Sequence, residues 1–146
     1  METSTHMHVP SLDVVRRMLS EAALPVADVI EERDLYFAAI GSPESPDGIV
    51  GLEITGAHAL LRSLVVAQLR RGTGVGRSLV AHAEQIARDH EVATLFLLTT
   101  TADGFFRRLG YLDATREGAP PAIRATREFS ELCPESSHFM TKSLDT

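Results

Sequence analysis

A glycine-rich loop near the middle of the chain, residues 72–76, leaves few folds open to this sequence. The segment before it, residues 59–67, is almost entirely apolar, which is typical of a buried strand. In the segment after it, residues 75–87, apolar side chains recur at helical spacing. A buried strand that passes through a tight glycine loop into a helix is the core unit of an α/β fold, so the other elements must pack around it.

The sequence on either side predicts the remaining elements. Residues 35–40 and 49–54 are short apolar runs joined by a segment rich in Gly, Pro, Ser and Asp, which predicts an antiparallel hairpin. The other expected elements are a helix that begins behind Ser11 as its N-cap, a strand at 92–98, a helix at 102–109 that ends at Gly110, and a terminal strand near 138–143. A chain of 146 residues has room for one such domain, residues 1–146.

The charge balance argues against nucleic acid or an anionic membrane as a partner. Twenty acidic and 14 basic side chains give a formal net charge of −6, so the mean field of the protein repels phosphate backbones. No apolar stretch approaches the roughly 20 residues that a membrane-spanning helix needs. The single cysteine, Cys133, cannot form an intramolecular disulfide, and the N-terminal residues lack the pattern of a secretion signal. We therefore expect a cytoplasmic protein, and no histidine spacing matches a metal motif.

The glycine loop has the chemistry of an anion-binding site. Glycines at alternate positions let successive backbone N–H groups converge, and the positive end of the following helix dipole points to the same place. Arg70, Arg71 and Arg77 add positive charge beside the loop. A P-loop is excluded because no lysine lies nearby, and a dinucleotide fingerprint fits poorly because Arg77 occupies its third glycine position. The sequence therefore predicts a phosphate-bearing ligand of another kind.

The same loop resembles the main motif of a known enzyme family. Arg71, Gly74 and Gly76 occupy an R/Q-x-x-G-x-G/A pattern at the start of a helix, and residues 102–111 resemble a second motif, a helix that ends in Gly-Phe or Gly-Tyr. On these motifs the chain resembles the Gcn5-related N-acetyltransferase (GNAT) family. The resemblance implies a single α/β domain with a central mixed, mostly antiparallel sheet flanked by helices, and an N-acetyltransferase that uses acetyl-CoA.

The resemblance also implies which residues bind acetyl-CoA. The amides of residues 71–76 are expected to hold the pyrophosphate, and the backbone of residues 64–66 is expected to pair with the pantetheine arm. The implied coenzyme-binding residues are Leu64, Val65, Val66, Arg71, Gly72, Thr73, Gly74, Val75, Gly76, Arg77, Thr100 and Phe106.

The sequence departs from the family at two positions that concern the leaving thiolate. The asparagine and the tyrosine that the family often uses fall at Thr100 or Thr101 and at Phe106. Phenylalanine cannot donate a proton. Either another group or water protonates the thiolate, or the thiolate leaves without assistance.

A narrower resemblance concerns the acceptor of the acetyl group. Leu61–Ser63, Leu98–Ala102 and Leu132–Pro134 resemble stretches of the arsenic-resistance N-acetyltransferases. This resemblance implies a small zwitterionic amine as the acceptor, either an organoarsenical or a phosphinic amino acid, and a role in detoxification. Dimers are common among related folds, so the resemblance is compatible with a homodimer.

Three side chains on the predicted hairpin and central strand are candidates for the chemistry. Arg62 interrupts a buried strand, so it must either pair with Glu53 on the neighbouring strand or reach into a cleft, where it suits a carboxylate or an oxyanion. Glu53 is the candidate general base, directly or through water, with a solvated strand position as the alternative. Alternation places Ser63 on the face opposite Arg62, either as a core hydroxyl or as a substrate contact. Glu53 and Arg62 are therefore predicted as catalytic, and Arg62 and Ser63 as substrate-binding.

The last third of the chain contributes three further candidates for substrate binding. Arg116 and Arg127 flank a proline-rich break and suit a lid that recognises an anion, with solvated arginines as the alternative. Cys133 is either a small buried side chain or a thiol that lines the acceptor pocket. Two other functions stay open: a non-catalytic acyl-CoA-binding or regulatory module, suggested by Phe106, and an arsenic sensor built on Cys133, which the absence of a second cysteine disfavours.

Overall fold

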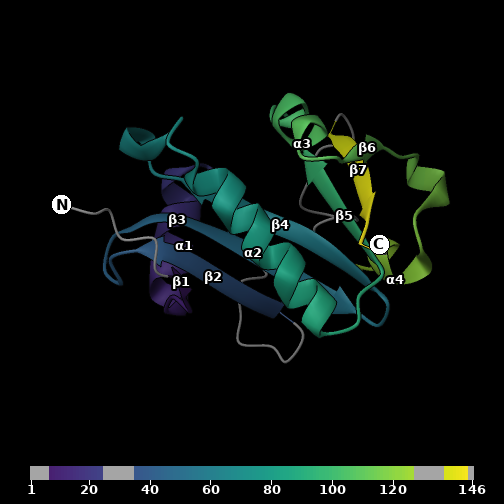
Figure 1. Cartoon of the computed structure of the whole chain (residues 1–146), viewed down its shortest axis with the longest axis horizontal. Coiled ribbons are helices and arrows are strands. Elements are labelled where there is room, and N and C mark those ends of the chain that lie inside the picture. The colour runs from purple at the N-terminus through teal and green to yellow at the C-terminus, as the bar shows by residue number, and fades with distance from the viewer. Residues whose placement is uncertain (1–6, 25–34, 127–136, 145–146) are drawn as a thin grey trace.

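The protein is described by a computed structural model that covers residues 7–24, 35–126 and 137–144. Within these residues, seven strands form one sheet in the order β1-β2-β3-β4-β5-β7-β6 (Figure 1). Neighbouring strands are antiparallel, except that β4 and β5 are parallel. The predicted mixed, mostly antiparallel sheet is therefore confirmed. The strands are β1 (Met7–His8), β2 (Leu35–Gly41), β3 (Pro46–Thr55), β4 (His58–Val66), β5 (Thr94–Thr99), β6 (Leu112–Asp113) and β7 (His138–Ser143).

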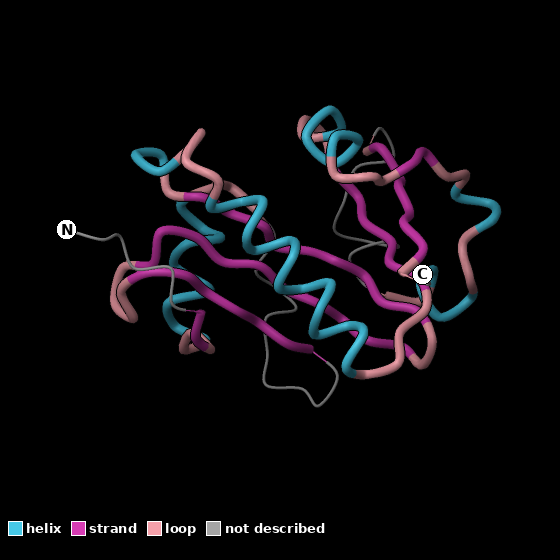
Figure 2. The backbone as a smooth tube through the Cα atoms, viewed as in Figure 1, coloured by secondary structure: helices cyan, strands magenta, loops and turns pink. Residues whose placement is uncertain are grey.

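Helices cover both faces of the sheet, with α2 in front of it and α1 behind it in the view of Figures 1 and 2. α1 (Leu12–Glu21) begins after Ser11, whose Oγ accepts a hydrogen bond from the Val14 amide at 3.2 Å, as expected of an N-cap. α2 (Val75–Asp89) follows β4 and leads to β5. None of the helices in the described segments is long and apolar enough to cross a bilayer. The short helices after β5 are α3 (Asp103–Arg108) and α4 (Pro121–Arg124).

Three apolar clusters hold these layers together. The largest lies between α2 and the sheet, a second lies under α1, and a third packs α4 on the sheet through Ile123. Consecutive residues of β4 serve different clusters, because Leu60 belongs to the α4 cluster and Leu61 to the α2 cluster. The centre of the sheet is therefore buried on both sides, which explains why β4 and β5 read as nearly continuous apolar runs.

The parallel strands β4 and β5 are neighbours over only part of their length. Their pairing joins residues 58–61 to residues 94–97. Beyond this, β4 continues to Val66 against β3, and β5 continues to Thr99 against β7. The two strands therefore separate at their carboxyl ends, which is the end of a parallel pair where α/β proteins bind ligands.

A β-bulge shapes the free end of β4. Gly51 of β3 pairs with Arg62 and Ile49 pairs with Val65, so a single β3 residue lies opposite two β4 residues. At the bulge, Ser63 has a φ of +59°, a left-handed conformation that is uncommon for a residue other than glycine. The bulge shifts the alternation of side chains between the two faces of the sheet by one residue. The face on which a side chain lies beyond the bulge therefore cannot be predicted from the alternation before it.

The structure departs from the sequence-based prediction mainly at short elements. β1, β6 and α4 were not predicted because two to four residues are too few to show a periodic pattern. β3 also begins earlier than predicted, at Pro46, inside the segment rich in turn-forming residues. Gly48 is part of this extension: a Cβ there would lie 2.9 Å from the carbonyl oxygen of Val65, so the glycine permits close contact between β3 and β4.

Candidate active site

A cavity of about 1160 Å³ opens where β4 and β5 separate. Its size is that of a ligand-binding site rather than of a packing defect. On one side, the walls come from the segment after α1 at residues 22–24, the free end of β4 at residues 61–66, and the glycine loop with the start of α2 at residues 70–72 and 74–77. The other walls come from the segment 97–102 and from α3 with Ser137. The predicted strand, glycine loop and helix therefore form one side of the cavity.

The glycine loop lines this cavity at the start of α2. Gly72 and Gly74 have φ values of +81° and +88°, and a Cβ at either position would have no neighbour within 4 Å. Gly74 is the N-cap of α2 and provides no side-chain cap, so the first amides of the helix remain available to a ligand. This arrangement supports the predicted anion site, because the amides and the helix dipole act on the same space.

The cavity is basic although the chain as a whole is acidic. No Asp or Glu occurs among its described lining residues, whereas five arginines line it: Arg62, Arg70, Arg71, Arg77 and Arg108. Arg70 is held by β3, since its Nε lies 3.2 Å from Oδ1 of Asp47. The local field therefore attracts an anion despite the net charge of −6.

One loop residue does not behave as predicted. Thr73 is absent from the described lining of the cavity, and its hydroxyl donates a hydrogen bond to the carbonyl of Arg70. The Thr73 amide also donates to this carbonyl, at 3.3 Å. The side chain therefore closes the turn of the loop, because a threonine hydroxyl readily bonds to nearby backbone.

The edge of β4 that faces the cavity suits an extended ligand. Residues 64–66, which are predicted to pair with the pantetheine arm, line the cavity, and in the described structure the ladder between β4 and β5 ends at Leu61. The third glycine of the loop has a different role from the first two. A Cβ at Gly76 would lie 3.3 Å from the Phe105 ring and 3.4 Å from the side chain of Val66, so Gly76 allows α2, α3 and β4 to meet.

Arg62 fulfils both of its predicted alternatives. Its side chain is 1% exposed, and Nη1 lies 3.5 Å from Oε1 of Glu53, yet the residue lines the cavity. Glu53 is not among the described lining residues. The predicted base therefore lies behind the arginine, and a direct contact with an amine in the cavity is not supported. Contact through a water molecule remains compatible with this placement.

The predicted placement of Ser63 is wrong. Its hydroxyl accepts a hydrogen bond from Nε of Arg62 at 3.2 Å, and the residue lines the cavity instead of lying on the opposite face. The bulge causes this, because a left-handed residue interrupts the regular alternation of the strand. Arg62 and Ser63 thus belong to the same wall, as the assignment of both to substrate binding requires.

The other side of the cavity is formed by the end of β5 and by α3. The Thr99 hydroxyl accepts a hydrogen bond from the Ala102 amide at 3.0 Å and so fixes the turn into α3. Thr100 and Phe106, which are predicted to bind the coenzyme, line the cavity together with Phe105. Phe106 is almost fully buried and packs edge-to-face on the ring of Tyr111. No tyrosine occurs among the described lining residues, so the departure from the family pattern at Phe106 is not compensated by a neighbouring phenol.

The predicted residues of the C-terminal third have different positions. Arg116 is half-buried and does not line the cavity; its guanidinium donates a hydrogen bond to the carbonyl of Ser137 at 3.2 Å. Its predicted contact with the substrate is therefore not supported, because the side chain is engaged with the backbone that precedes β7. Arg127 and Cys133 lie outside the described residues.

The sequence did not predict the segment after α1, Arg108 or Ser137 as residues of the cavity wall. Residues 22–24 and Ser137 carry no local signal of function, since only tertiary packing brings them to β4. Arg108 does have a signal, because it follows the two phenylalanines of α3 by a helical turn.

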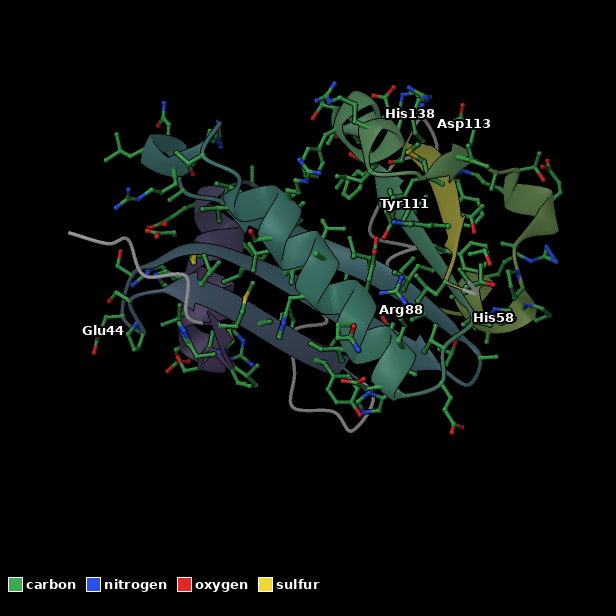
Figure 3. All side chains as sticks on the ribbon, viewed as in Figure 1. Glu44, His58, Arg88, Tyr111, Asp113 and His138 are labelled. Atoms are coloured by element: carbon green, nitrogen blue, oxygen red, sulfur yellow. The ribbon has the colours of Figure 1, made fainter. Side chains whose placement is uncertain are left out.

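A cluster of charges fixes α3 from the outside (Figure 3). The Arg107 guanidinium contacts Asp103 within α3 and donates to Oδ1 of Asp113 in β6 at 2.9 Å. His138 of β7 belongs to the same cluster, because its Nε2 lies 3.8 Å from Oδ1 of Asp103. The hydrogen bond from Arg107 holds the pKa of the Asp103 carboxyl below its usual range.

Comparison with known proteins agrees with this geometry. A family model described as an acetyltransferase (GNAT) domain matches residues 31–112. An uncharacterized N-acetyltransferase of Chlorobaculum tepidum is 40% identical over 65 residues, a match that spans 44% of this chain and 41% of that protein. The chain therefore spans less than half of the curated relative that it matches.

Solved structures share the fold at low sequence identity. N-acetylglutamate synthase of Neisseria gonorrhoeae, in complex with coenzyme A and N-acetyl-glutamate, has a TM-score of 0.75 at 19% identity; the match covers 100% of this chain and 36% of that one. A protein of Mycobacterium tuberculosis in complex with CoA has a TM-score of 0.74 at 17% identity; the match covers 94% of this chain and 98% of that one. Because the family model matches more than half of the chain, and these structures have the same fold, the chain belongs to the GNAT acetyltransferase family.

Proposed function

We propose that this chain transfers the acetyl group of acetyl-CoA to the amine of a small zwitterionic molecule. One observation carries the proposal: a basic cavity joins the glycine loop to the free edge of β4. A phosphate-bearing ligand with an extended arm matches these two features together. The family to which the chain belongs supports an acetyltransferase that uses this coenzyme.

The described residues suit the pyrophosphate and the pantetheine arm of coenzyme A. The amides of Gly72 and of residues 74–76, together with the flanking arginines, fit a pyrophosphate, because both supply positive potential without a metal ion. The amides of Arg71 and Thr73 instead donate to backbone carbonyls of the turn. The backbone edge at residues 64–66 fits an amide-bearing arm, which adds to a sheet as a strand does. Together these contacts orient a thioester toward Arg62 and Ser63.

The proposed reaction is a direct attack of the amine on the thioester carbonyl. A bond forms between the amine nitrogen and the acetyl carbon, the carbon–sulfur bond breaks, and the amine loses one proton. Glu53, acting through water, is the proposed acceptor of this proton. Since Phe106 cannot donate a proton, the thiolate leaves as an anion or is protonated by water. Alignment of the two reactants supplies most of the rate enhancement in this proposal.

The acceptor is proposed to carry a carboxylate or a related anion. Arg62 lines the cavity beyond the free edge of β4, and its planar guanidinium suits a bidentate anion. The resemblance of Leu61–Ser63 and Leu98–Ala102 to arsenic-resistance N-acetyltransferases supports an organoarsenical or a phosphinic amino acid, with detoxification as the role. Cys133 and Arg127 enter this proposal as sequence-based predictions only.

Calorimetric titration with acetyl-CoA, with CoA and NAD as comparators, tests the coenzyme. We expect acetyl-CoA and CoA to bind and NAD to fail, because NAD lacks an arm that can follow β4. A panel of amines headed by arsinothricin and phosphinothricin then tests the transfer, with release of free thiol as the readout. No heat and no thermal shift with acetyl-CoA would remove the proposal.

A second candidate function rests on Phe106. By the sequence resemblance, Phe106 falls at the position of the family's proton-donating tyrosine, and the residue lines the cavity. This suits a module that binds acyl-CoA without turnover. Tight binding of acetyl-CoA, together with no thiol release on any amine of the panel, would favour this function over the enzyme.

A further inference from the structure

Ser137 is a polar residue buried at the cavity without a partner for its hydroxyl. The residue precedes β7 and is 7% exposed. Within the described part of the chain, its Oγ has no hydrogen-bond partner, and the residue lines the cavity. Among the described residues two other buried side-chain atoms lack a partner, on His8 and His58, and neither residue lines the cavity. Ser137 is therefore distinguished by its place as well as by its unsatisfied hydroxyl.

The sheet places Ser137 across β5 from Arg62. β7 lies beside β5 on the side away from β4, and Thr99 pairs with His138. Ser137 therefore stands at the carboxyl end of β5, whereas Arg62 stands at the free end of β4. Strands in a sheet lie about 4.8 Å apart, and β4 and β5 diverge here, so a ligand must extend by roughly two strand spacings to meet both residues.

The backbone at Ser137 is held firmly even though the hydroxyl is not bonded. Arg116 donates a hydrogen bond to the Ser137 carbonyl, and the next residue, His138, begins the ladder to β5. Elsewhere in β7 the comparable hydroxyl is satisfied, because Oγ1 of Thr141 donates to the Leu95 carbonyl at 2.9 Å. A buried hydroxyl without a partner is costly, so a hydrogen bond to a ligand in the cavity would stabilise it.

We propose that the Ser137 hydroxyl hydrogen-bonds to the acceptor and sets a preference for amino acids with a polar side chain. This inference rests on the proposed function. Arg62 binds the carboxylate at one end of the acceptor, and the Ser137 hydroxyl forms a hydrogen bond with a polar group at the other end. An acceptor of the same length with an apolar side chain leaves the hydroxyl unsatisfied and is disfavoured.

The test compares Ser137→Ala with Thr141→Val, a control that removes a bonded hydroxyl from the same strand. The probes are phosphinothricin and glutamate, with norleucine and butylamine as apolar counterparts. We expect the wild-type chain to prefer the polar probes. Ser137→Ala should raise the KM of the preferred probe about ten-fold, the loss expected for one hydrogen bond to a charged group, and leave the KM of norleucine and the Kd of acetyl-CoA unchanged.

Thermal unfolding separates this role from a structural one. Removal of an unsatisfied hydroxyl should leave the Tm of Ser137→Ala at or above that of the wild type, whereas Thr141→Val should lower Tm without a change in acceptor KM. A lower Tm for Ser137→Ala would show a permanent partner and overturn the inference. So would an unchanged KM for the polar probe, or a wild-type preference for norleucine or butylamine.

Failure of the proposed function looks different. If the wild-type chain binds acetyl-CoA but acetylates no probe, the proposed function fails and this inference fails with it. If the wild type is active and Ser137→Ala matches it, only the inference about Ser137 is overturned.

Discussion

At the scale of single residues, the cavity depends on a few positions with left-handed backbone. Gly72 and Gly74 adopt this conformation in the loop without strain, whereas Ser63 adopts it with a side chain. The conformation at Ser63 forms the bulge that turns Arg62 and Ser63 to the same wall of the cavity. Strained residues of this kind occur preferentially at ligand sites, where the surrounding structure holds them in place.

Gly74→Val should strongly weaken acetyl-CoA binding without loss of the fold. The open space around Gly74 belongs to the cavity, so a valine side chain there would occupy the site of the pyrophosphate. We expect the affinity for acetyl-CoA to fall by about 100-fold, equivalent to about 2.7 kcal/mol. Gly56→Val is the matched control, because Gly56 also has a positive φ and open space but lies outside the cavity lining. Equal binding by the two variants, measured by calorimetry, would refute the role of the loop.

Arg62→Ala should affect the acceptor and spare the coenzyme. We expect the acceptor KM to rise about ten-fold, because one ionic contact is lost. Stability should also fall by about 2 kcal/mol, since Glu53 loses the arginine at 3.5 Å in a largely buried setting. Arg70→Ala is the control, because Arg70 also lines the cavity and also pairs with an acidic residue, Asp47. Since Arg70 lies beside the glycine loop, this variant should weaken acetyl-CoA binding and leave the acceptor KM unchanged. Steady-state kinetics in both substrates would test this. The prediction would be contradicted if Arg62→Ala and Arg70→Ala both raised the KM of the same substrate.

At the scale of elements, α3 is positioned by charges on its outer side and by rings on its inner side. Arg107 links α3 to β6, while Phe105 and Phe106 of the same helix line the cavity. The six-residue helix is too short to be stable alone, so these contacts determine where the two rings lie.

The pH dependence of this anchor follows from the lowered pKa of Asp103. The hydrogen bond from Arg107 is the main cause, so Arg107→Gln should raise this pKa toward its usual value of about 4. Because the folded-state pKa lies below the unfolded one, the contribution to stability is complete above the unfolded pKa. It is lost as the pH falls through the folded pKa. NMR titration of the Asp103 carboxyl would test this, and an unchanged midpoint in Arg107→Gln would contradict it.

At the scale of the whole molecule, a buried polar network joins the two halves of the divided sheet. The Tyr111 hydroxyl donates to Oε2 of Glu84 in α2 at 2.9 Å, and Nζ of Lys142 in β7 lies 3.0 Å from the same oxygen. Lys142 also donates to the carbonyl of Leu109 at 2.9 Å. Burial raises the pKa of Tyr111, so the phenol stays protonated and remains a donor. Lys142 pairs with Leu95, in the part of β5 that is still paired with β4. At this level of the sheet, the network and the core beneath α2 keep α2 and β7 together.

Lys142→Met should therefore destabilise the fold without weakening coenzyme binding. Removal of the ammonium leaves the Glu84 carboxylate, which is 7% exposed, with the Tyr111 hydroxyl as its remaining partner in the described structure. We expect a loss of about 2–3 kcal/mol, measured by urea denaturation. Adding Glu84→Gln should restore part of this loss, since the double variant has no buried charge to satisfy. A weaker affinity for acetyl-CoA in Lys142→Met would show that the network acts on the cavity.

The amino-acid sequence alone determined the order of the main elements and the chemistry of the glycine loop. Periodic apolar residues identify α1, α2 and the longer strands, because such patterns are local. The glycine spacing, with Arg71 and Arg77 beside it, indicates an anion site for the same reason: the loop residues that form it are neighbours in the chain. The family motifs likewise lie in continuous segments, which is why the fold class was predicted correctly.

Only the tertiary structure decided which residues face the acceptor. The bulge at Ser63, the position of Glu53 behind Arg62, the contact of Arg116 with Ser137 and the unsatisfied Ser137 hydroxyl all depend on segments far apart in the chain. Strand alternation cannot anticipate a bulge, and no local pattern shows that β7 lies beside β5. The coenzyme side of the cavity could therefore be predicted from the sequence, because one continuous segment forms much of it. The acceptor side required the fold, because several strands meet there.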